Sequence, residues 1–277
     1  MTETTTSTAP IAAAFARARD ERRVALVPYV MSGYPDEATS EAIAVALGQA
    51  GADVLELGVP FSDPLADGAT IQHASERALA QGMSLRRAVA LAGRIHAQVT
   101  TPLVLMGYYN PIVNVGLERF CEDAAAAGVA GLIVPDLPPE EAEPLRAAAA
   151  ARGIELIFLV TPTSPDARIA QVAEAASKTG GGFVYCVSLS GVTGARDRLP
   201  ETLPAFIARV REQINLPLAI GFSVSKPEHI AQIGQIADGA VVASALINAI
   251  DAAEPERRVE TAVTFLRGLQ SSASLAK

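Results

Sequence analysis

Short runs rich in Val, Ile and Leu alternate along this chain with longer Ala-rich stretches in which apolar residues recur at helical spacing. The short runs are typical of parallel strands buried on both faces, and the longer stretches are typical of the helices that connect such strands. Eight strand candidates follow one another in this way. They cover Val24–Val30, Val54–Leu57, Leu103–Met106, Leu132–Val134, Leu156–Val160, Phe183–Val187, Leu218–Ile220 and Ala240–Val242.

Helix candidates separate these strands, and several end in a glycine suited to a helix C-cap: Gly51, Gly128 and Gly153. The helix candidates cover Glu37–Ala50, Ser84–Ala97, Leu117–Ala127, Glu140–Ala151, Asp166–Ser177, Leu203–Gln213, Pro227–Ile236 and Ala245–Ala249. Eight β/α units in about 250 residues predict an α/β fold of the TIM (β/α)8 barrel type. A doubly wound sheet is the alternative, but it normally carries a Gly-rich turn after its first strand, and Met31–Pro35 contains none.

The barrel is expected to form a single domain over residues 10–270, with an extra helix at its N-terminal end. No linker rich in Pro, Gly or Ser divides the chain. The polar, Thr-rich residues 1–9 and the Ser/Ala tail at 271–277 are expected to be flexible. Gly180–Gly182 stands before the sixth strand, where it predicts a turn and not a phosphate-binding loop.

Composition excludes several classes of function. The net charge is −8, and Lys and Arg are scattered, so no basic surface for nucleic acid or an anionic membrane is expected. No apolar run reaches the roughly 18 residues needed to cross a bilayer.

The two cysteines, Cys121 and Cys186, lack neighbours at metal-ligand spacing, so we expect no metal site and a reducing cytoplasm. His73, His96 and His229 stand without catalytic partners and are expected in surface or packing roles.

Two connections after strands are unusually long, Pro60 to about Gly82 and Ser188 to about Thr202, and both are candidates for active-site lids. Just before the first of them, Glu56 lies inside an apolar strand on the same face as residues 54 and 58. Burial would raise the pKa of Glu56 and suit it to acid-base chemistry, although a structural glutamate is the alternative. Asp63 and Asp67 follow on the loop, where either can simply form a turn. Joined to Glu56 at one end of a barrel, a second carboxylate would face the same cavity.

Five segments, in this order along the chain, resemble the tryptophan synthase α subunit family. They are Leu55–Gly68 with its continuation Thr70–Gln72, Gly107–Pro111, Gly131–Pro138, Ser190–Gly194 and Gly221–Phe222. The resemblance implies a lyase that cleaves indole-3-glycerol phosphate, by a retro-aldol reaction, into indole and glyceraldehyde 3-phosphate.

The resemblance also implies residue roles. Glu56 matches the general acid-base, Asp67 the carboxylate that holds the indole N–H, and Tyr185 a tyrosine that supports the acid-base group. Thr193 is expected to close its loop toward Asp67. Further residues are expected to line the indole ring: Tyr29, Ile71, Leu105 and Phe222.

Phosphate is expected to bind backbone N–H groups near the last two strands and a short helix N-terminus. The candidates are Gly194, Phe222, Ser223, Ala243 and Ser244. Ser223 and Ala243 stand where many family members have glycine. Their N–H groups can still donate, provided that the backbone does not require a positive φ.

The resemblance implies no cofactor in this chain and a β subunit as partner in an α2β2 complex, which would carry pyridoxal phosphate, receive the indole and make tryptophan from serine. The Pro60–Asp67 loop and the Tyr108–Pro111 turn match the surface that faces the β subunit. A free-standing lyase remains an alternative. A non-catalytic phosphate-binding barrel is a second one, disfavoured by the intact Glu56 and Asp67.

Overall fold

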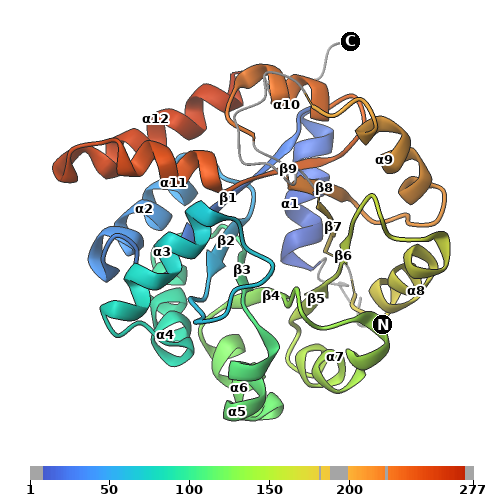
Figure 1. Cartoon of the computed structure of the whole chain (residues 1–277), viewed down its shortest axis with the longest axis horizontal. Helices are drawn as coiled ribbons and strands as arrows, with labels where there is room; N and C mark the ends of the chain where they lie inside the picture. Colours follow the sequence, from blue (N-terminus) through green and yellow to red (C-terminus); the bar gives the residue numbers. More distant parts are fainter. Residues whose placement is uncertain (1–8, 181, 188–198, 222–223, 272–277) are drawn as a thin grey trace, which may run out of the picture.

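A computed structural model of the chain describes residues 9–180, 182–187, 199–221 and 224–271. Its strands form one parallel sheet in the order β5-β4-β3-β2-β1-β9-β8-β7-β6. The two ends of this order, β5 and β6, are separated in the chain only by Phe158, so the sheet closes into a barrel (Figure 1). The strands are β1 (Ala25–Met31), β2 (Leu55–Gly58), β3 (Leu103–Met106), β4 (Val129–Ile133), β5 (Glu155–Ile157), β6 (Leu159–Val160), β7 (Val184–Val187), β8 (Leu218–Gly221) and β9 (Gly239–Val242).

The predicted (β/α)8 barrel is therefore confirmed, with one change in its strand count. The fifth predicted strand is split at Phe158: β5 pairs with β4 and β6 pairs with β7. The continuous segment from Glu155 to Val160 thus pairs with β4 through its first half and with β7 through its second.

Helices surround the sheet and cover its outer face (Figure 1). They are α1 (Pro10–Asp20), α2 (Glu37–Gln49), α3 (Ala69–Ala80), α4 (Leu85–His96), α5 (Tyr109–Val115), α6 (Leu117–Ala126), α7 (Glu143–Ala150), α8 (Asp166–Ser177), α9 (Leu203–Arg211), α10 (Pro227–Ile233), α11 (Ser244–Asp251) and α12 (Arg258–Gln270), with short 3-10 turns η1 (Pro139–Glu141) and η2 (Pro255–Arg257). None of the helices in the described part of the chain is long and apolar enough to cross a membrane.

Three of these helices, α3, α5 and α12, were not expected from the sequence. The α3 helix occupies half of the predicted lid between Pro60 and Gly82, so only the segment before Ala69 is a loop. The three predicted C-cap glycines are confirmed by their positive φ angles: 94° at Gly51, 75° at Gly128 and 71° at Gly153.

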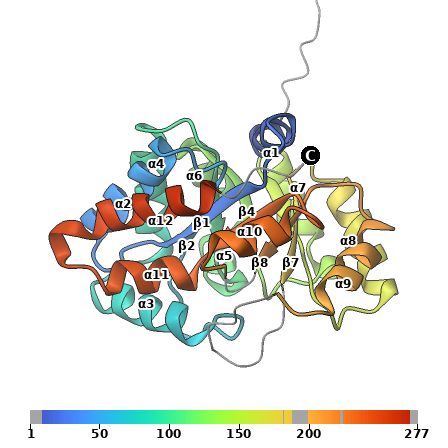
Figure 2. The same cartoon turned by 90° about the horizontal axis from the view of Figure 1, so that it is seen from above.

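The core has two parts. A large cluster fills the layer between the sheet and the helices, and a smaller one fills the inside of the barrel. The expected N-terminal helix, α1, lies across one end of the barrel (Figure 2) and contributes Ile11 and Phe15 to the inner cluster. Phe15 packs there against Phe183, with ring centroids 5.2 Å apart. This end is therefore closed by packing, which leaves the other end, where the strands finish, for chemistry.

The two ends that were expected to be flexible fall largely outside the described residues, at 1–8 and 272–277.

Candidate functional site

Glu56 faces the inside of the barrel near the end of β2. Its register partners are Tyr29 on β1 and Val104 on β3. Val54, two residues earlier, belongs to the inner cluster, whereas Leu55 and Leu57 pack in the outer layer. The side chain of Glu56 is only 2% exposed. The alternation predicted from the sequence is thus confirmed, and it places a carboxyl group in an apolar interior.

This environment favours the protonated form of Glu56. Its Oε2 atom has no hydrogen-bond partner. Burial raises the pKa of Glu56 to about 8, and the negative charge of Asp67 adds to the increase. At neutral pH the group therefore carries a proton that it can donate, and its conjugate base is accessible within the same pH range.

Asp67 lies on the loop between β2 and α3, just before Gly68, the N-cap of α3. Burial raises the pKa of Asp67 to about 6, while a hydrogen bond with Tyr108 opposes the increase. At neutral pH this carboxyl is mostly ionised. The two carboxyl groups thus favour opposite protonation states, as an acid and a neighbouring anion require.

Asp63, the other prominent acid of the loop, is exposed and bonds locally. Its carboxylate accepts a hydrogen bond from Ser62 at 2.5 Å, and its carbonyl accepts one from the N–H of Leu65 at 2.9 Å. These contacts are those of a turn, which was the expected alternative to a functional role.

Tyr29, Tyr108 and Tyr185 lie around the two carboxyl groups. Burial raises the pKa of each phenol, and the charge of Asp67 adds to the increase in all three. Glu56 contributes in the same sense to Tyr29 and Tyr185. Their hydroxyl groups are therefore neutral donors at working pH. Tyr185 stands on β7, four strands from β2 around the barrel, so its interaction with Glu56 runs across the inside of the barrel.

Two glycines make room for these rings. A Cβ atom at Gly58 would lie 1.9 Å from the Tyr29 hydroxyl oxygen, and one at Gly221 would lie 2.3 Å from a ring carbon of Tyr185. No side chain fits at either position without displacing a tyrosine.

Leu105 is one predicted site residue that the structure does not bring to the cavity. It packs in the outer layer together with Leu103, because side chains on a strand alternate between faces. Met106, the next residue, lies two residues beyond Val104, the register partner of Glu56, and packs against the inner cluster as well as the outer one. Met106 is therefore the residue at this end of β3 that faces inward. Ile71 is half-buried in the first turn of α3, four residues after Asp67, and packs against the outer cluster.

Of the predicted phosphate ligands, Ala243 and Ser244 stand where β9 ends and α11 begins. Both are half-buried, and the first backbone N–H groups of α11 have no partner within the helix. The remaining phosphate candidates lie outside the described residues: Gly194, Phe222 and Ser223. Thr193, expected to close its loop toward Asp67, lies outside them as well.

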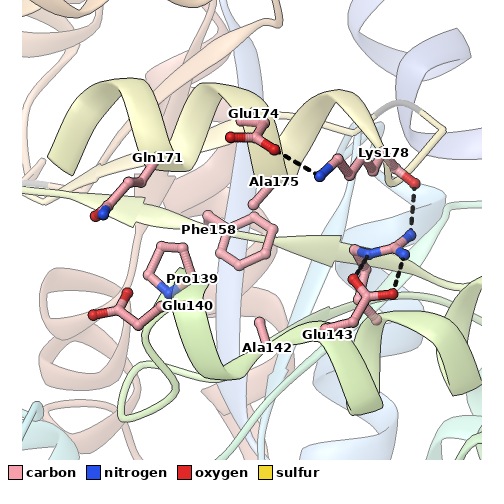
Figure 3. Close-up of a pocket in the computed structure, with 10 residues that line it drawn as sticks. Pro139, Glu140, Ala142, Glu143, Phe158, Gln171, Glu174, Ala175 and Lys178 are labelled. Carbon is pink, nitrogen blue, oxygen red and sulfur yellow. Dashed lines mark hydrogen bonds and ion pairs between the residues drawn. The ribbon is translucent and has the colours of Figure 1, made fainter. Parts of the chain in front are cut away.

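A separate hollow of about 240 Å³ lies outside the barrel between α7 and α8 (Figure 3). Phe158, from the split in the fifth strand, points into it. Its charged rim is paired internally: Glu143 with Arg146 at 2.6 Å, and Glu174 with Lys178 at 2.8 Å. The carboxylates at this hollow are thus neutralised in ion pairs, unlike Glu56 and Asp67, whose carboxyl groups favour different protonation states.

Tyr108 is the residue of this site whose role the sequence did not indicate. Its place directly after a predicted strand, at the catalytic end of a barrel, is the signal that could have found it. Its link to Asp67 depends on the loop conformation, which the strand pattern does not encode.

Comparisons with known proteins identify the family. The family model described as tryptophan synthase alpha chain matches residues 15–274. The tryptophan synthase alpha chain of Roseiflexus sp. strain RS-1 is 54% identical over 94% of this chain and 98% of its own length. That of Chloroflexus aurantiacus is 50% identical over 95% and 97%.

Solved structures give the same result. A structure of tryptophan synthase from Mycobacterium tuberculosis superposes with a TM-score of 0.88 at 37% identity, covering 96% of this chain and 98% of that one. The tryptophan synthase alpha chain of Legionella pneumophila gives 0.86 at 34% identity, covering 96% and 98%. With a barrel that carries an inward-facing glutamate and a neighbouring loop aspartate, this chain belongs to the tryptophan synthase alpha chain family.

Proposed function

We propose that Glu56 and Asp67 together catalyse the retro-aldol cleavage of indole-3-glycerol phosphate to indole and glyceraldehyde 3-phosphate. The observation that carries this proposal is the pair of carboxyl groups at one end of the barrel, with pKa values of about 8 and about 6. Family membership supplies the substrate.

Glu56 acts first as the acid. It donates its proton to C3 of the indole ring, which turns the ring into an indolenine cation. The Glu56 carboxylate then takes the proton of the glycerol hydroxyl next to the bond that breaks. As the carbon–carbon bond cleaves, its electron pair returns to the ring, the hydroxyl carbon becomes an aldehyde, and Glu56 has its proton back.

Asp67 stabilises the cation between these two steps. Its ionised carboxylate accepts a hydrogen bond from the ring N–H, where the positive charge is centred. An anion held in a half-buried site interacts more strongly with that charge than it would in water. Tyr185 supports Glu56 as a neutral hydroxyl on the opposite side of the barrel, and Tyr29 and Met106 supply walls for the ring.

The phosphate of the substrate binds at the N-terminus of α11, through the backbone N–H groups that follow Ala243 and Ser244. A helix N-terminus attracts anions because its first N–H groups are unpaired and its dipole is positive there. Gly194, Phe222 and Ser223 complete this site in the proposal, and Thr193 closes toward Asp67. A positive φ is not required at Ala243, whose φ is −114°.

The chain works with a β subunit in an α2β2 complex, in which pyridoxal phosphate belongs to the β subunit and indole passes to it. The exposed apolar side chains of the described residues support this assembly, because Leu65 on the β2–α3 loop is 95% exposed and Val113 on α5 is 48% exposed. Both elements lie where the family's partner surface is expected. We place the complex in the cytoplasm.

The proposal is tested by measuring indole release from indole-3-glycerol phosphate by the wild type, Glu56→Gln and Asp67→Asn, each mixed with a β subunit. We expect both variants to lose activity by about a hundredfold or more, since one lacks the proton donor and the other the anion. Glu155→Gln is the matched control. It changes another buried glutamate, at the first residue of β5, and should retain wild-type activity.

Equal rates in the wild type and Glu56→Gln would remove the acid-base role. A wild type without activity would favour a barrel that only binds a phosphate or a partner.

A further inference from the structure

Tyr108 connects the end of β3 to the loop that carries Asp67. Its side chain is 4% exposed. Its hydroxyl oxygen accepts a hydrogen bond from the backbone N–H of Ala66 at 3.0 Å. Ala66 is the residue directly before Asp67, so this bond fixes the backbone at the point from which the carboxylate projects.

The same hydroxyl group still has its own proton to donate, since a phenol can accept one hydrogen bond and donate another. The Asp67 carboxylate is the charged group nearby that acts on this proton: the interaction raises the pKa of Tyr108 and lowers that of Asp67, the signs expected for a phenol that faces a carboxylate. One side chain thus fixes the backbone before Asp67 and interacts with the carboxylate itself.

The Tyr108 ring is held from two directions. It stacks on Phe61, with ring centroids 5.0 Å apart and planes 27° apart. Phe61 is in turn fixed by Ser75 on α3, whose hydroxyl accepts from the Phe61 N–H at 3.0 Å and donates to its carbonyl at 3.1 Å. On the other side, the Tyr109 N–H donates to the carboxylate of Asp136, just after β4, at 2.9 Å. The position of Tyr108 is therefore set by β3, β4 and α3 together.

We propose that Tyr108 is a positioning residue for the lyase reaction, which fixes the loop backbone at Ala66 and so places the Asp67 carboxylate for the indole N–H. This inference rests on the proposed function, because it assumes that Asp67 carries the charge-stabilising role. Without the hydroxyl, Asp67 keeps its loop contact through its carbonyl, which accepts from Gln72 at 2.9 Å, but its side chain loses this restraint.

The test compares Tyr108→Phe with the wild type. This change keeps the ring stacked on Phe61 and removes only the hydroxyl. We expect kcat/KM at pH 7 to fall by about tenfold. The acid limb of the pH profile should also move to higher pH, because the group that lowers the pKa of Asp67 is gone. A purely structural loss would reduce the rate without moving that limb.

Tyr34→Phe is the matched control. The Tyr34 hydroxyl also donates to a carboxylate, that of Asp251 at 2.6 Å, and its side chain is 5% exposed. It joins other elements, the β1–α2 loop and α11, so its loss should leave the acid limb in place. Far-UV circular dichroism of both variants checks that the fold is unchanged.

A second readout does not depend on activity. The Asp67 carboxyl pKa is measured by carbon NMR, with the resonance assigned from Asp67→Asn. An upward shift in Tyr108→Phe supports the inference, and an unchanged pKa together with an unchanged acid limb overturns it. If the proposed function fails, Asp67→Asn retains activity, and the NMR titration still shows whether Tyr108 controls the carboxylate.

Discussion

At the scale of single residues, two buried glutamates illustrate how the same environment has different consequences. Glu56 and Glu155 are 2% and 3% exposed, and burial raises the pKa of both. Glu56 has a carboxylate and tyrosines as neighbours at the catalytic end of the barrel. Glu155 is the first residue of β5, at the opposite end, and neither of its oxygens has a hydrogen-bond partner. Glu155 therefore costs stability without serving the reaction.

We predict that this cost depends on pH. Burial raises the pKa of Glu155 to about 7, above its value in an unfolded chain. The stability from the protonated form is fully present below the unfolded pKa and is lost as the pH rises through about 7. From pH 5 to pH 8, Glu155→Gln should therefore gain about 2 kcal/mol of unfolding free energy relative to the wild type.

Urea unfolding of both proteins at the two pH values measures this gain. A stability difference that is the same at pH 5 and pH 8 would mean that Glu155 does not titrate in this range.

The residues of the site were predictable where strand alternation or a motif determined them. The inward face of Glu56 was predicted from its apolar neighbours, and the structure confirms that alternation. Asp67 was chosen over Asp63 by the family resemblance, because a place on a long loop suits a turn-forming aspartate equally well. The prediction that Leu105 faces the indole ring was wrong by one position, because Met106 is the residue that faces inward. In a continuous run such as Leu-Val-Leu-Met, every residue is apolar, so the sequence does not indicate which face turns inward. Only the register with β2 and β4 places Met106 inside.

At the scale of elements, the loop before α3 and the short helix α5 form one unit. Tyr108 ties the loop to the start of α5, and both carry exposed apolar side chains: Leu65 at 95%, Val113 at 48% and Val115 at 42%. Exposed apolar side chains on two linked elements are expected to lie against another protein. We therefore expect the elements that position Asp67 to contact the β subunit as well.

We predict that Leu65→Asp weakens binding to the β subunit by at least about tenfold, since a buried Leu side chain contributes about 1.5–3 kcal/mol. The stimulation of indole release by added β subunit should need correspondingly more β subunit. Titration of β subunit into each variant, followed by indole release, measures this. Thr264→Asp, on the exposed face of α12, adds the same charge elsewhere and serves as the control.

Identical titration curves for Leu65→Asp and Thr264→Asp would show that this loop is not part of the surface that binds the β subunit. No stimulation of the wild type by any amount of β subunit would favour a free-standing lyase.

Elements were harder to predict where tertiary contacts decide them. The α3 helix lies within a connection that begins with turn-forming residues, which concealed its helical pattern. The α5 helix begins at Tyr109, three residues after the end of β3, where its N–H is bound by Asp136 from the segment after β4. The split at Phe158 also has no local signal. It arises because β5 and β6 must pair with different neighbours to close the barrel.

At the scale of the whole molecule, barrel closure brings together residues that are far apart in the sequence. Glu56 and Tyr185 come from β2 and β7, and only the closed ring of strands makes them neighbours. The packing of α1 against the inner cluster closes the other end of the barrel. Glu56 thus lies in an apolar interior that α1 closes at one end, and burial there raises its pKa to about 8.

In the proposed reaction, Glu56 reacts in its protonated form beside an ionised Asp67. The most direct test is the pH dependence of kcat/KM for indole release, with β subunit present. We predict a bell-shaped profile: activity falls below about pH 6, as Asp67 takes up a proton, and above about pH 8, as Glu56 loses one. The limb near pH 8 is decisive because the substrate phosphate does not titrate there. Activity that stays constant from pH 7 to pH 10 would show that the reaction does not depend on a protonated Glu56.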